Sequence, residues 1–377
     1  MEYRPFGQLP FKVSALGFGC MRLPTRGSYD AVDEPATVEM LRYAVDQGVN
    51  YIDTAYPYHG GNSERAVGRA LEGGYRERVA LATKMPIWAV KGPEDFDRLF
   101  AEQLERLRTP RIDFYLLHNL QAGSWERMRG LGVIPWMEKA RADGRIGQVG
   151  FSFHDTYDAF RGIVDGYGGW TFCQIQYNYV NEDVQAGTRG LQYAAARGLA
   201  VVVMEPLHGG TLAQPPEPVR QLWQEAGRDP VATALRWLWD KPEVSVVLSG
   251  MSTLDQVREN VRSASASGVG TMTAEDKGLV ARAAAAYREL HAVPCTKCGY
   301  CLPCPHGVAI PENFEIYNGA RTFGGNVLAL NRNLYGQMPP ARRADACKAC
   351  RECEAKCPQH IKIRDWLAMV HEEMTNR

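Results

Sequence analysis

The chain has 377 residues, 45% of them hydrophobic, which allows one large core and a smaller second domain. Its 43 basic and 43 acidic side chains cancel, and a net charge of zero argues against strong binding to nucleic acid or to an anionic membrane surface, so small molecules or other proteins are the expected partners. No apolar run reaches the roughly 18 residues of a membrane span, and the N-terminal segment lacks the apolar stretch of a signal peptide, so we expect a cytoplasmic protein.

Short apolar runs alternate with stretches of helical periodicity between residues 12 and 262, and the alternation repeats eight times. Residues 3–6 and 9–13, on either side of Gly7, predict a hairpin that closes the bottom of the repeat. The predicted strands are 13–21, 50–55, 79–84, 112–118, 146–152, 172–178, 200–206 and 244–250. The predicted helices begin near Glu34, Ser63, Glu94, Glu126, Thr156, Val184, Asp229 and Thr253.

Eight strand–helix units of this length predict an α/β protein with a (β/α)8 TIM barrel. A doubly wound sheet is the alternative, because it also alternates strands with helices. Such a sheet usually carries a Gly-x-Gly-x-x-Gly turn after its first strand, and the one candidate, residues 17–22, lacks the third glycine. The barrel is therefore favoured. We expect it to span residues 1–270, followed by a helical connector over 271–291 and a second domain over 292–377.

Polar residues stand where the carboxyl ends of the predicted strands meet, which is where such barrels place their chemistry. Asp53 ends the second strand and Tyr58 follows five residues later, while Lys84 and His118 end the third and fourth strands. A phenol has a pKa of about 10 and needs a neighbouring cation to exchange protons near pH 7. We therefore expect Lys84 to lower the pKa of Tyr58, Asp53 to keep Lys84 charged, and His118 to bind the substrate oxygen. A structural role at the barrel rim is the alternative for each residue taken singly.

Residues 1 to about 262 resemble the aldo-keto reductase family. The resemblance is carried by residues 16–21, 51–58, 62–64 and 250–260 and by the strand ends at Lys84 and His118. The resemblance implies reversible reduction of an aldehyde or ketone by a nicotinamide cofactor. It makes Tyr58 the general acid and base, Lys84 and Asp53 the pair that tunes it, and His118 the group that orients the substrate.

The same resemblance places the cofactor along the strand ends. It puts the nicotinamide near Ser152 and Gln174, and the ribose and pyrophosphate near the first and seventh strands. The adenine lies near Glu259 and Asn260, where free N–H groups at the start of a helix would attract phosphate. An ordinary helix cap is the alternative there. The residues expected to bind the cofactor are Gly19, Cys20, Met21, Ser152, Gln174, Met204, Pro206, Leu207, Gly250, Ser252, Gln256, Glu259 and Asn260.

Several positions depart from the family pattern. Gly250 and Gln256 stand where members that prefer NADPH usually carry Lys or Arg, so the choice between NAD and NADP stays open. Met204 replaces the aromatic ring that commonly stacks on the nicotinamide, and Phe153 replaces an asparagine. Methionine is a weaker platform for a flat ring, so a flavin in the same cavity is the second candidate cofactor.

Eight of the ten cysteines form two runs in the last part of the chain. The second run has the Cys-x2-Cys-x2-Cys-x3-Cys-Pro spacing of bacterial ferredoxins, and the first is one residue shorter before its last cysteine. Three closely spaced thiolates hold one [4Fe-4S] cluster, and the fourth reaches the neighbouring cluster. Zinc is the alternative, but it needs fewer ligands than these runs supply. The predicted ligand sets are Cys295, Cys298, Cys301 and Cys357 for one cluster and Cys347, Cys350, Cys353 and Cys304 for the other.

The second domain resembles the helical two-cluster ferredoxins of multi-subunit reductases, with apolar anchors at Phe314, Ile316, Leu328, Leu330 and Leu334. A hydride carries two electrons and a cluster takes one, so direct exchange needs an intermediary. Three functions therefore stay open. The protein is a carbonyl reductase with structural or redox-sensing clusters, a reductase fed with electrons by a carrier protein, or a non-catalytic nucleotide and redox sensor.

Overall fold

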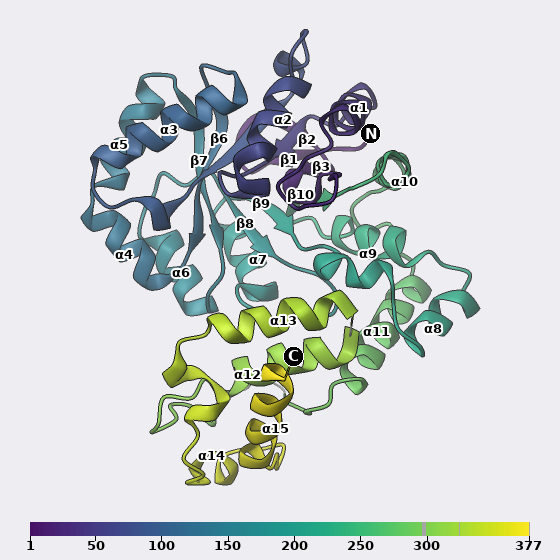
Figure 1. The fold of residues 1–377 in the computed structure, drawn as a ribbon. Helices are drawn as coiled ribbons and strands as arrows, with labels where there is room; N and C mark the ends of the chain where they lie inside the picture. Colours follow the sequence, from purple (N-terminus) through teal and green to yellow (C-terminus); the bar gives the residue numbers. More distant parts are fainter. Residues whose placement is uncertain (296–298, 324, 377) are drawn as a thin grey trace. The chain divides into compact units, whose positions relative to one another are not determined.

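The structure is a computed structural model that describes residues 1–295, 299–323 and 325–376 (Figure 1). It divides into two compact units, one formed by Met1–Gly210 with Val231–Lys277 and the other by Thr211–Pro230 with Gly278–Arg377. The division falls inside a helix, α11 (Ala274–Glu289). The boundaries expected from the sequence, 1–270, 271–291 and 292–377, stay a prediction.

Eight parallel strands within the described residues close into a barrel (Figure 1), which confirms the predicted fold class. Around the barrel, each strand pairs with the next one in the chain, and β10 closes the ring by pairing with β3. The strands are β3 (Leu16–Gly19), β4 (Tyr51–Asp53), β5 (Ala80–Met85), β6 (Ile112–Leu120), β7 (Ile146–Phe153), β8 (Phe172–Gln176), β9 (Ala200–Met204) and β10 (Val244–Gly250).

The first predicted strand, 13–21, is wrong at both ends. Its beginning belongs to β2 (Leu9–Ser14), which pairs antiparallel with β1 (Tyr3–Phe6) in the predicted hairpin. Its end, Cys20–Arg22, is a short 3-10 helix, η1. Residues of the hairpin and of the barrel strand are both apolar because both are buried. The sequence therefore shows one continuous apolar run and gives no sign of the break between β2 and β3.

The hairpin closes the amino end of the barrel through Phe6, which is fully buried. Its ring centroid lies 4.6 Å from that of Phe114 and 5.6 Å from that of Phe172. Gly7 makes the turn with a φ of +57°, and a Cβ there would lie 2.7 Å from the carbonyl oxygen of Gly198. Only glycine fits this turn without strain.

Helices surround the barrel strands (Figure 1). The single helix predicted near Glu126 is two helices, interrupted by Gly132 in a left-handed conformation. The helices of this unit are α1 (Glu34–Asp46), α2 (Asn62–Ala70), α3 (Glu94–Leu107), α4 (Ala122–Gly130), α5 (Val133–Ala142), α6 (Tyr157–Asp165), α7 (Gly187–Ala196), α9 (Pro230–Trp239) and α10 (Leu254–Ser265).

The second unit is helical and has its own core, in which Phe314, Tyr317 and Val370 are buried. Leu330 and Leu334 were expected to anchor this core, and that expectation is wrong, because they are 51% and 42% exposed. They lie on another face of their helix than the residues that pack inward. The helices are α8 (Val219–Glu225), α11, α12 (Ile310–Phe323), α13 (Gly325–Gln337), α14 (Glu352–Ala355) and α15 (Ile363–Thr375).

Within the described part of the chain, every helix is too short or too polar to cross a lipid bilayer.

Candidate active site and cluster sites

Strand geometry brings the predicted catalytic residues to one end of the barrel. Side chains alternate between the two faces of a strand, so residues two apart share a face. The interior of the barrel holds Tyr51, Ala82, Leu116 and Phe172. Two positions further along the same strands, toward the carboxyl ends, stand Asp53, Lys84, His118 and Gln174.

Asp53 and Lys84 form a buried ion pair on the adjacent strands β4 and β5. Lys84 Nζ lies 2.6 Å from Asp53 Oδ1, and the two side chains are 1% and 4% exposed. The ammonium also donates a hydrogen bond to the carbonyl oxygen of Thr54 at 2.8 Å. Gln174 Nε2 donates to the second oxygen of Asp53 at 3.2 Å. Removing either member would leave the other charge buried and unpaired, which is strongly destabilising.

Tyr58 and His118 complete the group. Tyr58 begins η2 (Tyr58–Gly61), and Lys84 Nζ lies 5.1 Å from the centroid of its ring. The ring of His118 meets that of Tyr58 edge to face, with 6.0 Å between centroids. Burial, together with the charge of Lys84, lowers the pKa of His118 well below its ordinary value. His118 is therefore a neutral imidazole at physiological pH, which suits a hydrogen bond to an uncharged carbonyl oxygen.

The expected direction of the Tyr58 pKa is wrong. Burial raises the pKa of Tyr58 well above its ordinary value, and the carboxylate of Asp53 raises it further. The ammonium of Lys84 is directed at Asp53, 2.6 Å away, so the carboxylate balances its charge. The phenol therefore stays protonated near neutral pH, which is the form that donates a proton.

The loops around these residues add a polar rim. Trp88 packs against His118 with 5.1 Å between ring centroids. Glu205 follows β9 with a φ of +56°, an uncommon conformation for a residue with a side chain, and its charge adds to the raised pKa of Tyr58. Tyr56 lies in the same loop as Tyr58, but its hydroxyl donates to Glu102 Oε2 at 2.8 Å and so turns away from this group.

Sequence reasoning missed two residues of this rim. The ring of Tyr29 stacks on that of His59 with 4.4 Å between centroids. Gln185 Nε2 donates to Gln176 Oε1 at 3.3 Å. Both lie in loops outside any recognisable motif, so only their position after a barrel strand could have indicated them.

The residues expected around the nicotinamide fit an amide group. Gln174 Oε1 is buried and accepts no hydrogen bond from any described residue. A buried carbonyl oxygen without a partner is costly, and the N–H of a carboxamide would satisfy it. Ser152, beside Gln174 in the register of β7 and β8, accepts a hydrogen bond from the Asn119 N–H at 2.8 Å. Met204 ends β9 and is partly exposed.

The residues expected around the adenine and the phosphates do not share one exposed face. Asn260 is buried and donates to Ser249 Oγ at 3.0 Å, whereas Gln256 and Glu259 are exposed. The start of α10 is also capped by its own side chains, because Gln256 Oε1 accepts from the Ser252 N–H at 2.8 Å. Burial therefore separates Asn260 from Gln256 and Glu259, although the three residues lie within about one turn of the same helix.

The remaining predicted cofactor residues follow strands β3, β9 and β10. Gly19 and Gly250 are direct partners in the β3–β10 register. Ser252 Oγ donates to the carbonyl oxygen of Arg22 at 2.7 Å, which ties the loops after these two strands together. Cys20, Pro206 and Leu207 are buried or partly buried, and Met21 is exposed.

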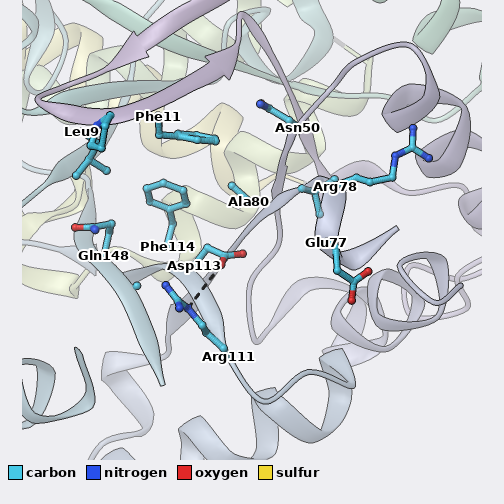
Figure 2. A pocket seen from close by; sticks show the side chains of 13 residues that line it. Leu9, Phe11, Asn50, Glu77, Arg78, Ala80, Arg111, Asp113, Phe114 and Gln148 are labelled. Carbon is cyan, nitrogen blue, oxygen red and sulfur yellow. Dashed lines mark ion pairs between the residues drawn. The ribbon is translucent and has the colours of Figure 1, made fainter. Parts of the chain in front are cut away.

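A different hollow lies at the opposite end of the barrel, and Figure 2 shows the side chains that line it. Phe11 of the hairpin and Phe114 face each other there, with 5.9 Å between ring centroids. Arg111 and Asp113 form an ion pair at 3.8 Å on its edge. This end of a parallel barrel usually serves stability and not catalysis, so the polar groups at the other end remain the candidate active site.

Three cysteines from both runs surround one small cavity in the second unit. Cys295 and Cys301 come from the first run and Cys357 from the second, and the cavity is also lined by Ile310 and Phe314. Cys298, the fourth predicted ligand, lies outside the described residues. Thiols from both runs around an apolar cavity fit a cluster that is ligated in the crossed arrangement.

Cys347, Cys350 and Cys353 lie around α14. The Ala349 N–H donates to Cys347 Sγ at 3.5 Å, and burial, with a further contribution from the charge of Glu354, raises the pKa of Cys353. Cys350 is exposed, whereas Cys304 packs against the core of the unit. Among the described residues, no three His, Cys, Asp or Glu side chains converge closely enough for a single metal ion.

Comparisons with known proteins agree with this architecture. A family model described as "Aldo/keto reductase family" matches residues 15–274, and one described as "4Fe-4S dicluster domain" matches residues 294–362. The chain is 29% identical over 284 residues to L-galactose dehydrogenase of Arabidopsis thaliana, covering 69% of this chain and 87% of that protein. It is 25% identical over 312 residues to the NADH-specific methylglyoxal reductase of Escherichia coli, covering 69% and 93%.

Solved structures resemble the barrel. The holo form of aldo-keto reductase AKR11C1 from Bacillus halodurans matches with a TM-score of 0.62 and 25% identity, over 75% of this chain and 96% of that chain. An aldo-keto reductase from Klebsiella pneumoniae in complex with NADPH shares the fold with a TM-score of 0.60 at 24% identity, over 75% and 95%. The chain belongs to the aldo/keto reductase family of NAD(P)-dependent oxidoreductases and carries a 4Fe-4S dicluster domain at its C-terminal end.

Proposed function

We propose that the barrel reduces an aldehyde or ketone, with a nicotinamide dinucleotide as hydride donor and Tyr58 as proton donor. The observation that carries this proposal is the buried Asp53–Lys84 pair beside the Tyr58 ring and next to His118. Two of the similar proteins are named for acting on L-galactose and methylglyoxal, both of which are small carbonyl compounds. Which carbonyl this protein reduces is decided by the polar rim, with Glu205 and Trp88 among its members.

The chain's own residues have distinct roles in this reaction. Ser152 and Gln174 would hold the carboxamide of the cofactor. When bound, the cofactor would supply a hydride to the carbonyl carbon of the substrate. His118, as a neutral imidazole, orients the substrate by a hydrogen bond to its oxygen. Tyr58 donates its phenolic proton to that oxygen as negative charge develops there. Lys84 then stabilises the phenolate left behind, and Asp53 keeps the ammonium charged and in place.

The second unit, in this proposal, holds two [4Fe-4S] clusters. Cys295, Cys298, Cys301 and Cys357 would bind one of them, and Cys347, Cys350, Cys353 and Cys304 would bind the other. A cluster of this kind moves electrons one at a time, whereas the cofactor delivers two as hydride. An alternative function, favoured by the exposure of Cys350, is a reductase whose clusters exchange electrons with a carrier protein.

The pH dependence of turnover tests the protonation states. The pKa of Tyr58 is raised, so the phenol stays protonated, and the pKa of His118 is lowered, so the imidazole stays neutral. We expect kcat/KM for carbonyl reduction to be nearly constant from about pH 7 to about pH 9, and alcohol oxidation, which needs the phenolate, to accelerate throughout that range. A Glu205→Gln variant should shift the oxidation profile to lower pH, because Glu205 contributes to the raised pKa. A reduction rate that falls between about pH 7 and about pH 8 would contradict the assignment.

Binding of a cofactor analogue tests Gln174. The unpaired Oε1 should accept a hydrogen bond from the carboxamide N–H, and losing such a bond costs about 1–3 kcal/mol, or roughly 5- to 150-fold in affinity. Wild-type protein should therefore bind NAD(P)H more tightly than the 3-acetylpyridine analogue, which has no such donor, by about that factor. A Gln174→Met variant should bind both with similar Kd, as measured by nucleotide fluorescence. Equal discrimination in the variant would argue for another acceptor.

A further inference from the structure

Positive charge is concentrated around the second cysteine run. Residues 342–364 contain seven Lys or Arg and three Asp or Glu, in a chain whose net charge is zero. The segment that holds the first run, residues 295–312, contains one basic and one acidic residue. The two predicted cluster sites therefore differ in charge, although they belong to the same small unit.

Four of these cations are available for a partner. Lys348, Arg351, Lys356 and Lys362 are exposed, and none of them makes an ion pair with another described residue. We refer to these four residues as the basic surface. The other three cations of the segment are paired within the protein. These pairs are Arg342 with Glu312 at 2.6 Å, Arg343 with Asp345 at 3.7 Å and Arg364 with Asp365 at 2.6 Å.

The basic surface surrounds a cysteine that is itself exposed. Lys348 lies between Cys347 and Cys350 in the chain, and Arg351 directly follows Cys350, which is the exposed thiol of the run. Ala349 and Arg351 both have left-handed backbone conformations, with φ of +56° and +64°. Left-handed conformations are uncommon for residues other than glycine. Two of them so close together are typical of a functional site, such as a turn that binds a ligand. The cluster of this run would therefore lie close to the surface, with Glu352 and Glu354 beside Cys353 and an excess of positive charge over the whole segment.

The surface near the first run is of another kind. Tyr300 is 66% exposed and Leu302 is 43% exposed, and neither carries a charge. Charge complementarity therefore favours the second run as the place where a charged partner approaches.

We propose that the basic surface docks an acidic one-electron carrier protein, which exchanges electrons with the cluster of Cys347, Cys350 and Cys353. This inference rests on the two clusters proposed above and goes beyond carbonyl reduction. One electron passes from the reduced carrier to the oxidised cluster, or in the reverse direction, and no atom is transferred. Complementary charge raises the association rate of such pairs and makes it dependent on salt. Nucleic acid is the less favoured partner, because the cations gather around a redox ligand and the whole chain is neutral.

Stopped-flow reduction of the full-length, cluster-loaded protein tests the proposal. An acidic plant-type [2Fe-2S] ferredoxin serves as the carrier, and the rate is measured in whichever direction is favourable by following the visible absorption of the clusters. We expect the second-order rate constant to fall about tenfold or more as the ionic strength rises from about 0.01 M to about 0.1 M, because the Debye length shortens from about 30 Å to about 10 Å.

Charge reversal locates the docking surface. Lys348→Glu with Lys356→Glu should lower the rate constant at low salt about tenfold or more and weaken its salt dependence, and Lys362→Glu, which is not adjacent to a cysteine, should lower it in the same direction. The matched control is Arg282→Glu with Arg288→Glu on α11, which makes the same change in net charge and should leave the rate nearly unchanged. Dithionite, a small reductant, should reduce the clusters of all variants equally.

The outcomes separate this inference from the function on which it rests. Protein that binds no iron and sulfide after anaerobic reconstitution contradicts the proposed clusters. Cluster-loaded variants that react with the carrier as fast as the wild type, or a wild-type rate that does not change with salt, overturn the docking surface alone. The docking surface is also overturned if single-stranded RNA binds the basic surface in preference to the ferredoxin.

Discussion

Replacing Tyr58 with phenylalanine should lower kcat for carbonyl reduction by about 10²- to 10⁴-fold, the usual contribution of a general acid. The substitution removes one oxygen and keeps the ring, so the packing against His118 and the position over Lys84 should survive. The Kd for NAD(P)H and the iron content should stay close to the wild-type values. Steady-state turnover, measured together with fluorescence titration, checks each of these expectations.

Tyr56→Phe is the matched control, because Tyr56 lies in the same loop and its hydroxyl is bonded to Glu102 away from the candidate site. This variant should retain nearly full activity. If the two variants lost activity equally, the effect would be on the loop and not on proton transfer. A Tyr58→Phe variant with more than about a tenth of the wild-type kcat would remove Tyr58 from its proposed role.

Replacing Cys357 with alanine should have the second largest effect of the substitutions considered. Although Cys357 belongs to the second cysteine run, its loss should affect the cluster that the first run holds. Cys357 lines the same cavity as Cys295 and Cys301, although it lies more than 50 residues later in the chain. The folding of small metal-binding units depends on ligand binding, so losing one ligand should lower the iron content by about half and destabilise the second unit. Iron and sulfide analysis with EPR spectroscopy of the reduced protein measures the first effect, and limited proteolysis measures the second.

The crossed ligand sets can be distinguished from uncrossed ones by combining substitutions. Under the crossed assignment, Cys357→Ala with Cys295→Ala damages one cluster and leaves the EPR signal of the other. Under an uncrossed assignment, the same pair damages both. A double variant without any intact cluster would therefore overturn the proposed ligand sets, whereas carbonyl reduction by the barrel should persist in every variant that folds.

Much of the candidate site could be predicted because strand geometry is local. Asp53, Lys84 and His118 end consecutive apolar runs, and the two-residue period of a strand together with parallel pairing brings such ends to the same side of a barrel. The spacing of the cysteines likewise indicates which thiols can bind one cluster. In both cases a few residues of sequence determine the geometry, and no knowledge of distant contacts is needed.

The errors have a different origin. Asn260 was expected beside Glu259 at the adenine, which stays a prediction, but its burial against Ser249 depends on how the helix packs. The strand expected over residues 13–21 is divided, because a hairpin that pairs elsewhere takes its first half. Helical periodicity and apolar composition predict that a residue is buried, but they do not predict which part of the protein it packs against.

The amino-acid sequence by itself determined the order of strands and helices, the polar ends of the strands and the two cysteine runs, because these depend on local spacing and side-chain chemistry. Only the tertiary structure gave the direction of the Tyr58 pKa, since burial raises it and the nearby carboxylate of Asp53 raises it further. Only the tertiary structure showed that Cys357 lines the same cavity as Cys295 and Cys301. Contacts between distant segments depend on packing, which a local sequence pattern does not specify.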